Sequence, residues 1–336
     1  MEKPRVKYED VFAVSVKVNP FPEYTIAWLM ERYINEMNGW GGGKPVRPIG
    51  ETSYYKFRQL QEMPIGKLDA AKLTKEDVKV HCRSRINDDN VLPATVMHDI
   101  TALTVVLKHA PSEWDDCERR GISVAPIELA KPSLQKHGYI GKSTPRTRVP
   151  TDEEIEKLIG FFSTPKRKAA SNEITAMPDM IAFALMSSRR VGEICRIRRS
   201  DINWENVDKD GNRAPLYMVR DVKDPKKKIG NHMWFPLFPE LEEIVLRQPE
   251  REDRIFPYRA KSVSAKYTRA KRDLKIVGLR FHDCRREAIT RALARGLSPH
   301  QVRHYYSGHK TTVMLERVYD ATKPDGGFAA VKQAAA

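Results

Sequence analysis

The sequence predicts a mainly α-helical protein with one small β-hairpin or sheet, divided between two domains. Its 336 residues exceed the roughly 100–200 residues of a typical single domain. Apolar residues recur at helical spacing through the first 140 residues, without the alternation of a half-buried strand. Two short strand-like stretches, "PLYMVRDV" and "NHMWFPL", flank a lysine-rich turn in the second half. These stretches predict the only β-structure.

The first predicted helix covers residues 21–37, "FPEYTIAWLMERYINEM". One face of it would carry an apolar stripe at helical spacing, made of Tyr24, Trp28 or Leu29, Tyr33 and Met37. A glycine-rich turn from Gly39 to Pro45 ends the helix.

Two further helices of the first half have recognisable starts. Thr74 is a predicted N-cap, with Asp77 three residues later as its capping partner. Pro93 occupies a helix-start position, and an apolar face follows it. The residues of that face are Ile100, Leu103, Leu107 and Ala110.

A domain boundary is expected in "HGYIGKSTPRTRVP", residues 137–150, with a linker over 141–150. The linker carries three basic residues, Lys142, Arg146 and Arg148. They could contact a phosphate backbone, and a solvated linker without that role is an equal alternative. Thr151 and Glu154 then form a predicted capping box that opens the second domain.

Positive charge is concentrated in the second half of the chain. The net charge of the whole chain is +15, but residues 1–145 hold 21 Lys and Arg against 19 Asp and Glu. Residues 146–336 hold 38 against 25, a net of +13, and residues 251–336 alone have a net of +11. A localised excess of this kind indicates a polyanionic partner, most simply nucleic acid.

Other classes of function are disfavoured by what the sequence lacks. No apolar run approaches the roughly 20 residues that span a bilayer, so no membrane partner is expected. The N-terminus lacks the apolar stretch of a signal peptide, which predicts a cytoplasmic, nucleoid-associated protein. The four cysteines are far apart in the chain and are expected to be reduced thiols rather than disulfides or zinc ligands. No phosphate-binding G-x-x-x-x-G-K-[ST] loop is present, so ATP use is not expected.

Four short stretches of the basic half carry residues suited to chemistry. They are "RRVGE" with Arg190 and Glu193, "VKDPKKK" with Lys223, "HDCRR" with His282 and Arg285, and "SGHKTTVMLERVYDA" with His309 and Tyr319. Each alone is ordinary: an Arg–Glu pair three apart is usually a surface ion pair worth about 0.3 kcal/mol. Their occurrence together, in this order and in the basic half, favours a shared site.

The four stretches resemble the tyrosine recombinases, also called phage-type integrases. That family carries, in order, an Arg in "G-x-R-x-x-E", a Lys on a hairpin, an H-x-x-R, a "G-H" and a Tyr. The resemblance covers residues 151–321 and extends to "EICRIRRSDI" and "HDCRREAITRALARG". It implies a helical core-binding domain over 21–140 and a mixed α/β catalytic domain over 151–321.

The chain departs from the family pattern in several places. Ser188 stands where the family usually has glycine, and Arg189 replaces an apolar residue. The intervals from Arg285 to His309 and from His309 to Tyr319 are each one residue longer than usual. The hairpin is also longer, which leaves the catalytic lysine open among Lys223, the first choice, and Lys226, Lys227 and Lys228.

The resemblance implies that Tyr319 attacks a DNA phosphodiester and forms a 3′-phosphotyrosyl intermediate. Arg190 and Arg285 would clamp the phosphate oxygens, with His309 as a third donor. Lys223 would protonate the leaving 5′ oxygen, His282 would position or deprotonate the nucleophile, and Glu193 would orient Arg190. The arginines would supply the charge stabilisation, so no metal or other cofactor is expected.

The implied partners are double-stranded DNA recombination sites, a homo-tetramer on two duplexes, and an accessory DNA-bending or directionality factor. The implied function is that of a site-specific DNA recombinase or integrase of a mobile element, and the sequence leaves integration, excision and resolution open as its direction. Residues 1–20 are an N-terminal extension, and residues 322–336 are a tail whose short helix would dock on a neighbouring protomer. Two alternatives remain open: relaxation of DNA by a type IB topoisomerase-like enzyme, and a non-catalytic DNA-binding regulator.

Overall fold

The computed structural model describes residues 19–40, 48–144, 146–164, 176–222, 230–309, 311–312 and 315. The chain divides into two compact units, residues 1–144 and 145–336. Of the predicted features, most of the N-terminal extension, the lysines at 223 and 226–228, Tyr319 and the tail lie outside the described residues. In the part of the chain that is described, no helix is long and apolar enough to cross a membrane.

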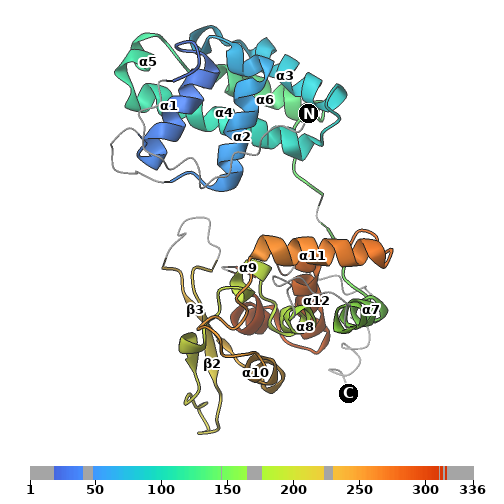
Figure 1. Cartoon of the computed structure of the whole chain (residues 1–336). Coiled ribbons are helices and arrows are strands. Elements are labelled where there is room, and N and C mark those ends of the chain that lie inside the picture. The colour runs from blue at the N-terminus through green and yellow to red at the C-terminus, as the bar shows by residue number, and fades with distance from the viewer. Residues whose placement is uncertain are drawn as a thin grey trace, which may run out of the picture. The chain divides into compact units, whose positions relative to one another are not determined.

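The regular elements of the first unit are all helices in its described residues, with one isolated β-bridge between Thr25 and Asp69 (Figure 1). Its helices are α1 (Ile26–Asn38), α2 (Glu51–Glu62), α3 (Lys75–Asn87), α4 (Pro93–Glu113), α5 (Asp115–Arg119) and α6 (Ala125–Lys136). Short 3₁₀ turns at Pro64–Lys67 and Ala70–Lys72 connect α2 to α3.

Local sequence determines where several of these helices begin. The Thr74 hydroxyl accepts a hydrogen bond from the backbone N–H of Asp77, and the Asp77 carboxylate accepts one from the backbone N–H of Thr74. Pro93 occupies the first turn of α4, where a missing N–H costs nothing. The predicted capping box and the predicted proline start are therefore both confirmed.

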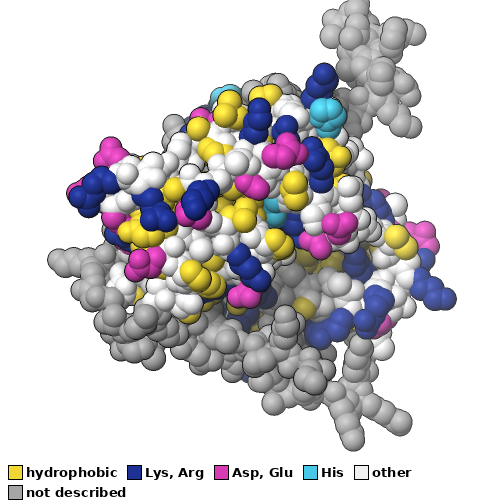
Figure 2. Space-filling view, turned by 90° about the horizontal axis from the view of Figure 1, so that it is seen from above, with side chains coloured by type: hydrophobic (Ala, Val, Ile, Leu, Met, Phe, Trp, Pro, Cys, Tyr) yellow, Lys and Arg dark blue, Asp and Glu magenta, His cyan; other side chains and the backbone are white. Residues whose placement is uncertain are grey.

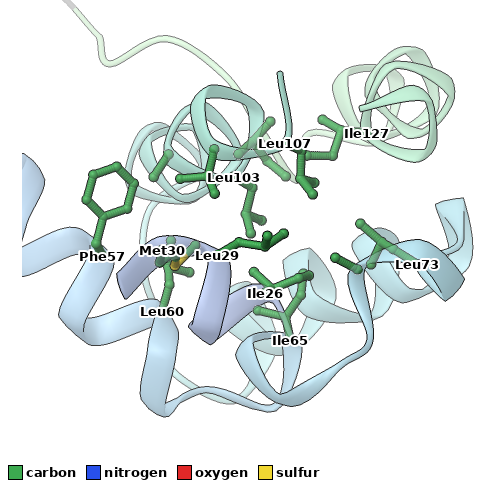
Figure 3. Close-up of a cluster of buried hydrophobic side chains, with 14 of the residues drawn as sticks. Ile26, Leu29, Met30, Phe57, Leu60, Ile65, Leu73, Leu103, Leu107 and Ile127 are labelled. Carbon is green, nitrogen blue, oxygen red and sulfur yellow. The ribbon is translucent and has the colours of Figure 1, made fainter. Parts of the chain in front are cut away.

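The predicted core face of α1 is only partly correct. The helix starts at Ile26 rather than in the stretch from residue 21, because the Thr25 side chain caps it by accepting from the Trp28 N–H. Its fully buried residues are Ile26, Leu29, Met30 and Ile34, whereas Tyr24, Trp28, Tyr33 and Met37 are only partly buried at the edge of the core. Figure 3 shows Leu29 and Met30 directed toward side chains of α2 and α4.

Many charged side chains of the first unit are paired with one another. Arg83 bonds Glu76 at 3.0 Å and Lys108 pairs with Glu128 at 2.9 Å on the surface. On the face shown in Figure 2, basic and acidic side chains are interspersed rather than separated. This agrees with the nearly balanced charge of the first 145 residues.

The second unit combines helices with one small sheet, so the predicted fold class is confirmed. Its helices are α7 (Asp152–Ser163), α8 (Met177–Ser187), α9 (Val191–Ile194), α10 (Pro239–Leu246), α11 (Ala260–Asp273), α12 (Phe281–Ala294) and α13 (Pro299–Val302). A 3₁₀ turn, Arg199–Asp201, leads into the sheet, and a π turn, Arg303–Ser307, follows α13. The capping box predicted at Thr151 is confirmed, since Thr151 and Glu154 bond each other's backbone N–H.

The sheet is antiparallel, in the order β1 (Ile202–Asn203), β2 (Leu216–Val219) and β3 (Met233–Pro236). Strands β2 and β3 are the two predicted from the sequence, and β1 is an additional strand that was not predicted. On the buried face Tyr217 pairs with Phe235, and their ring centroids are 6.0 Å apart. Phe183 of α8 meets Tyr217 edge-on at 5.9 Å.

Helix α8 is the centre of the second unit (Figure 1). It packs against α7, α10 and α12, and its residues Ile181, Phe183 and Ala184 are completely buried. Each fully buried side chain of Ile or Phe size contributes about 1.5–3 kcal/mol to stability. This core holds the C-terminal end of α8 beside both the sheet and α12, where the site residues meet.

Candidate active site

Arg190 is the N-cap of α9, at the end of the turn that joins α8 to α9, and Glu193 lies within α9. The Glu193 carboxylate is buried and accepts two hydrogen bonds from Arg190: one from its backbone N–H at 3.1 Å and one from Nη1 at 2.6 Å. The Arg190 side chain keeps 27% of its surface exposed. Glu193 therefore fixes the direction of a guanidinium that still reaches solvent.

The turn requires a left-handed residue, and Ser188 supplies it at φ +58°. This is the position at which the related pattern has glycine, which adopts such a conformation without strain. A serine there costs on the order of 1–2 kcal/mol. The Ser188 carbonyl accepts a hydrogen bond from Arg285 Nη1, so the strained turn is tied to α12.

Arg285 is the structural centre of the site. Only 1% of its surface is exposed, and its Nη2 donates to the Ser307 carbonyl at 2.8 Å. The same Nη2 lies 3.4 Å from His309 Nε2. One guanidinium thus joins the end of α8, the helix α12 and the turn that carries His309.

The contact with Arg285 defines the state of His309. A guanidinium can only donate, so Nε2 of His309 is the acceptor and the ring proton lies on Nδ1. Burial, followed by the positive charges of Arg285, Arg190 and Arg189, lowers the pKa of His309 to about 4. The ring is therefore neutral at physiological pH in the free protein.

A π turn lies in the interval between Arg285 and His309, which is one residue longer than in the family pattern. Residues 303–307 close with a hydrogen bond from the Gly308 N–H to the Arg303 carbonyl at 2.9 Å, a span of five residues instead of four. Such turns absorb one inserted residue within a helix and often occur at functional sites. Gly308, at φ +63°, then reverses the chain so that His309 faces Arg285.

His282 lies on the first turn of α12, one turn before Arg285. Partial desolvation and then the charges of Arg285 and Arg190 lower its pKa below the ordinary value. The residue is nevertheless exposed at the surface. The structure therefore brings Arg190 into contact with Glu193 and Arg285 into contact with His309. The two pairs and His282 lie within electrostatic reach of one another.

The linker arginines make contacts within the second unit. Arg146 Nη2 bonds the Gly278 carbonyl at 2.5 Å and the Asp283 carboxylate at 3.0 Å. Arg148 bonds Glu154. Lys142 is exposed. Their role in DNA binding stays a prediction, and Arg146 also supports α12, because Asp283 caps that helix by accepting from the Arg280 N–H at 2.8 Å.

Sequence reasoning did not foresee the contacts made by Ser307 and Arg189. The Ser307 hydroxyl accepts from the His309 N–H at 3.3 Å while its carbonyl holds Arg285. Arg189 is fully buried behind Glu193, and the doubled arginine in "RRVGE" was its signal in the sequence.

Among the described residues there is no group of three or more His, Cys, Asp or Glu that could hold a metal ion.

Two guanidiniums and an imidazole converging beside a buried carboxylate define a site for phosphoryl transfer. Comparison with known proteins places this site in a family. Residues 148–324 match the phage integrase family. The match covers more than half of the chain, so the chain belongs to that family, the tyrosine recombinases. The family predicted from the motifs is thereby confirmed.

Individual relatives agree with this assignment. The chain is 25% identical over 276 residues to a shufflon-specific DNA recombinase of Escherichia coli, a match that covers 80% of this chain and 63% of the length of that protein. The fold is similar to that of the Tn1549 transposon integrase in complex with transposon right end DNA, at 16% identity and a TM-score of 0.64, covering 93% and 100% of the two chains. It is also similar to a lambda integrase tetramer bound to a Holliday junction, at 17% identity and a TM-score of 0.60, covering 88% and 77%.

The depressed pKa of His309 predicts a pH-dependent stability. Between pH 6.5 and about 4 the unfolded chain binds a proton at His309 that the folded chain excludes, so the free energy of unfolding falls as pH falls. The positive groups facing the ring are Arg285, Arg190 and Arg189, with Glu193 as the opposing charge. His309→Gln should make this decline shallower in urea unfolding at stepped pH. His300→Gln, at an exposed histidine, is the control and should keep the wild-type decline. If the free energy of unfolding of His309→Gln fell with pH as steeply as that of wild type, the prediction would be wrong.

Proposed function

We propose that the chain is a site-specific DNA recombinase that cleaves and rejoins strands through a 3′-phosphotyrosyl intermediate. The observation that carries this proposal is the position of Arg285. It holds the Ser188 carbonyl, the Ser307 carbonyl and His309 at once, beside the Arg190–Glu193 pair. Family membership supports the same reaction.

Arg190 and Arg285 bind the non-bridging oxygens of the scissile phosphate in this proposal. Negative charge grows on those oxygens as the phosphorus becomes five-coordinate, and charge-assisted donors held in place stabilise that state. Glu193 orients Arg190 and does not act as a base, because its carboxylate is buried and hydrogen-bonded to Arg190. The neutral His309 adds a ring N–H as a further donor.

The chemical step is a transesterification by Tyr319. Its hydroxyl oxygen forms a bond to phosphorus, its proton passes to His282, and the bond from phosphorus to the 5′ oxygen breaks. His282, with its lowered pKa, is neutral and able to accept that proton. Lys223 protonates the leaving 5′ oxygen. Attack by the 5′-hydroxyl of another strand reverses each transfer and releases the tyrosine, so the number of phosphodiester bonds is conserved.

Strand exchange between two duplexes requires cleavage of four strands, and we propose a homo-tetramer for that reason. The fold is shared with a lambda integrase that forms a tetramer on a Holliday junction, which supports this assembly. Docking of the tail, residues 322–336, on a neighbouring protomer and an accessory DNA-bending or directionality factor belong to the same proposal. So does a nucleoid location in the cytoplasm.

The decisive experiment traps the covalent intermediate. The protein is incubated with a library of nicked duplexes that carry random sequence around the nick, so that cleavage releases a short strand that cannot religate. Denaturing gels isolate DNA attached to protein, sequencing gives the site, and mass spectrometry of the peptide gives the tyrosine. Failure to attach any DNA would favour a non-catalytic regulator. Supercoil relaxation without recombinant products would favour a topoisomerase.

The identity of the general acid can be tested with the duplex recovered in that experiment. Lys223→Ala should slow cleavage strongly because the 5′ oxygen is a poor leaving group without a proton. A substrate with sulfur at the 5′ bridging position needs no proton and should restore the rate of this variant. Rescue of a Lys226, Lys227 or Lys228 variant, with none for Lys223→Ala, would assign the role to that lysine.

Gly308 should be intolerant of a side chain. A Cβ there would lie 3.1 Å from Phe235 Cζ and 3.4 Å from Met233 Sδ, in a backbone conformation that L-residues disfavour. Gly308→Ala should lose about 1–2 kcal/mol of stability from the strain and lower the rate of covalent cleavage more than about tenfold, because His309 is displaced.

Gly296 offers a matched control for that variant. It also has a positive φ, of +86°, but a Cβ there would meet nothing within 4 Å. Gly296→Ala should therefore lose a similar amount of stability, measured by urea unfolding, and keep its cleavage rate. Equal loss of cleavage in both variants would show that strain alone, rather than the position of His309, is responsible.

A further inference from the structure

Arg189 is a buried arginine that the proposed reaction does not use. Its side chain has no exposed surface. Its Nε donates to the Ser187 carbonyl at 3.1 Å, but in the described structure neither Nη1 nor Nη2 has a hydrogen-bond partner. Burying a guanidinium with two unsatisfied nitrogens lowers the stability of the folded protein. Such a cost is expected where the residue serves the function of an adjacent site.

The guanidinium of Arg189 lies beside Glu193 and is linked to the turn that carries His309 through Phe235 of β3. On one side its Nη1 lies 4.0 Å from Glu193 Oε2. On the other it stacks on the Phe235 ring, 3.6 Å from the ring centroid. The Cζ edge of the same ring packs against Gly308, the residue before His309. The buried side chain of Arg189 therefore lies between the Arg190–Glu193 pair and Phe235, the ring that packs beneath Gly308 and His309.

The charge of Arg189 also changes the balance around Glu193. A lone Arg190–Glu193 pair is electrically neutral and attracts a phosphate weakly. Burial raises the pKa of Glu193, but Arg189, Arg190 and Arg285 together hold it below the ordinary value, and Arg189 has the largest Coulombic effect of the three. Arg189 interacts with the Glu193 carboxylate from the buried side, so Arg189, Arg190 and Glu193 together have a net charge of about +1. This positive charge is felt at the surface that Arg190 reaches.

We propose that Arg189 is a positioning residue for the cleavage reaction. It balances Glu193 from the interior, so that Arg190 keeps its attraction for the scissile phosphate, and it supports Phe235 beneath the Gly308–His309 turn. The inference rests on the proposed function, and it concerns a residue that occupies an apolar position in the related pattern.

The test compares Arg189→Met, which removes the charge but keeps a long stem on Phe235, with Arg189→Lys, which keeps the charge. Arg213→Met is the control. Arg213 lies in the exposed connection between β1 and β2, and it pairs with Glu242 of α10 rather than with a residue of the site. Single-turnover covalent cleavage at saturating DNA, half-site affinity and the thermal midpoint are measured for each variant. The DNA is the duplex selected with the wild-type protein.

Arg189→Met should cleave at least about tenfold more slowly. Its half-site affinity should stay within about threefold, because Arg189 is not proposed to touch DNA. Its thermal midpoint should stay near the wild-type value, because its two terminal nitrogens make no hydrogen bonds and Glu193 keeps its hydrogen bonds from Arg190. Arg189→Lys should recover part of the rate, and Arg213→Met should change nothing. A purely structural residue behaves differently, since its loss of rate accompanies a lower midpoint and is not restored by lysine.

Either of two results overturns the inference: Arg189→Met cleaving within about threefold of wild type, or a slower rate that follows a fall in the thermal midpoint without rescue by lysine. Both leave the proposed function intact, because the wild-type protein still attaches to DNA. Absence of attachment by the wild-type protein is the separate result that removes the proposed function.

Discussion

Tyr319→Phe should abolish covalent attachment to DNA and leave binding of the half-site nearly unchanged. The substitution removes one hydroxyl oxygen, which is the atom that forms the bond to phosphorus, and keeps the ring. Without that oxygen no other group of the proposed site can form the phosphotyrosyl bond, so the expected loss is complete rather than partial. Denaturing gels of the nicked duplex measure attachment, and gel-shift titration measures binding.

The two tyrosines just before His309, Tyr305 and Tyr306, serve as matched controls. Tyr305 lies on the π turn with 44% of its surface exposed, whereas Tyr306 stacks on Phe238 with ring centroids 5.5 Å apart. Tyr305→Phe and Tyr306→Phe should both retain attachment. Finding DNA on a peptide that contains either residue, together with attachment by Tyr319→Phe, would overturn the assignment of the nucleophile.

Local signals in the sequence predicted the helix starts well. A capping box needs only two residues three apart, and both that were predicted, at Thr74 and at Thr151, have the expected reciprocal hydrogen bonds. The two strands on either side of the lysine-rich segment were predictable because each is a short local run of strand-forming residues. Strand β1 has only two residues, and its pairing with β2 across a long connection cannot be found from periodicity.

The choice of buried face on α1 depended on tertiary packing. Tyr24, Trp28, Tyr33 and Met37 form as good an apolar stripe as the residues that are fully buried. Both stripes satisfy helical spacing. Packing against α2 and α4, which are separate segments of the sequence, determines which of the two stripes is buried. Periodicity alone therefore predicts the helix but does not determine which of two apolar faces is central.

The site was predictable as a set of side chains but not as a set of contacts. Motif order selected Arg190, Glu193, Arg285 and His309, which the structure brings together. The acceptors that hold Arg285 are backbone carbonyls, and a carbonyl has no signature in the sequence. Counting residues revealed one extra position before His309, but the π turn in that interval depends on a backbone hydrogen bond, which has no signature in the sequence.

Arg285→Ala and Arg190→Ala should each reduce covalent cleavage by at least about a hundredfold, because each removes a donor from the charged transition state. The two variants should differ in stability. Arg285→Ala leaves the buried carbonyls of Ser188 and Ser307 without that donor, at a cost of about 1–3 kcal/mol each. Arg190 is partly exposed, and Glu193 keeps Arg189 at 4.0 Å, so Arg190→Ala should unfold nearer to the wild-type midpoint.

Arg190→Ala is therefore the cleaner measure of the phosphate clamp, and Arg285→Lys separates charge from geometry for the second arginine. A lysine keeps the positive charge but has a single nitrogen, which cannot hold two carbonyls and His309 as the guanidinium does. Arg285→Lys should thus remain defective in cleavage although its charge is unchanged. Arg286→Ala, on the same helix, controls for loss of one basic residue and should cleave within about threefold of wild type. If Arg189→Ala lowers the cleavage rate more than Arg190→Ala does, the order of roles in the adjacent pair is reversed, and Arg189 rather than Arg190 belongs to the clamp.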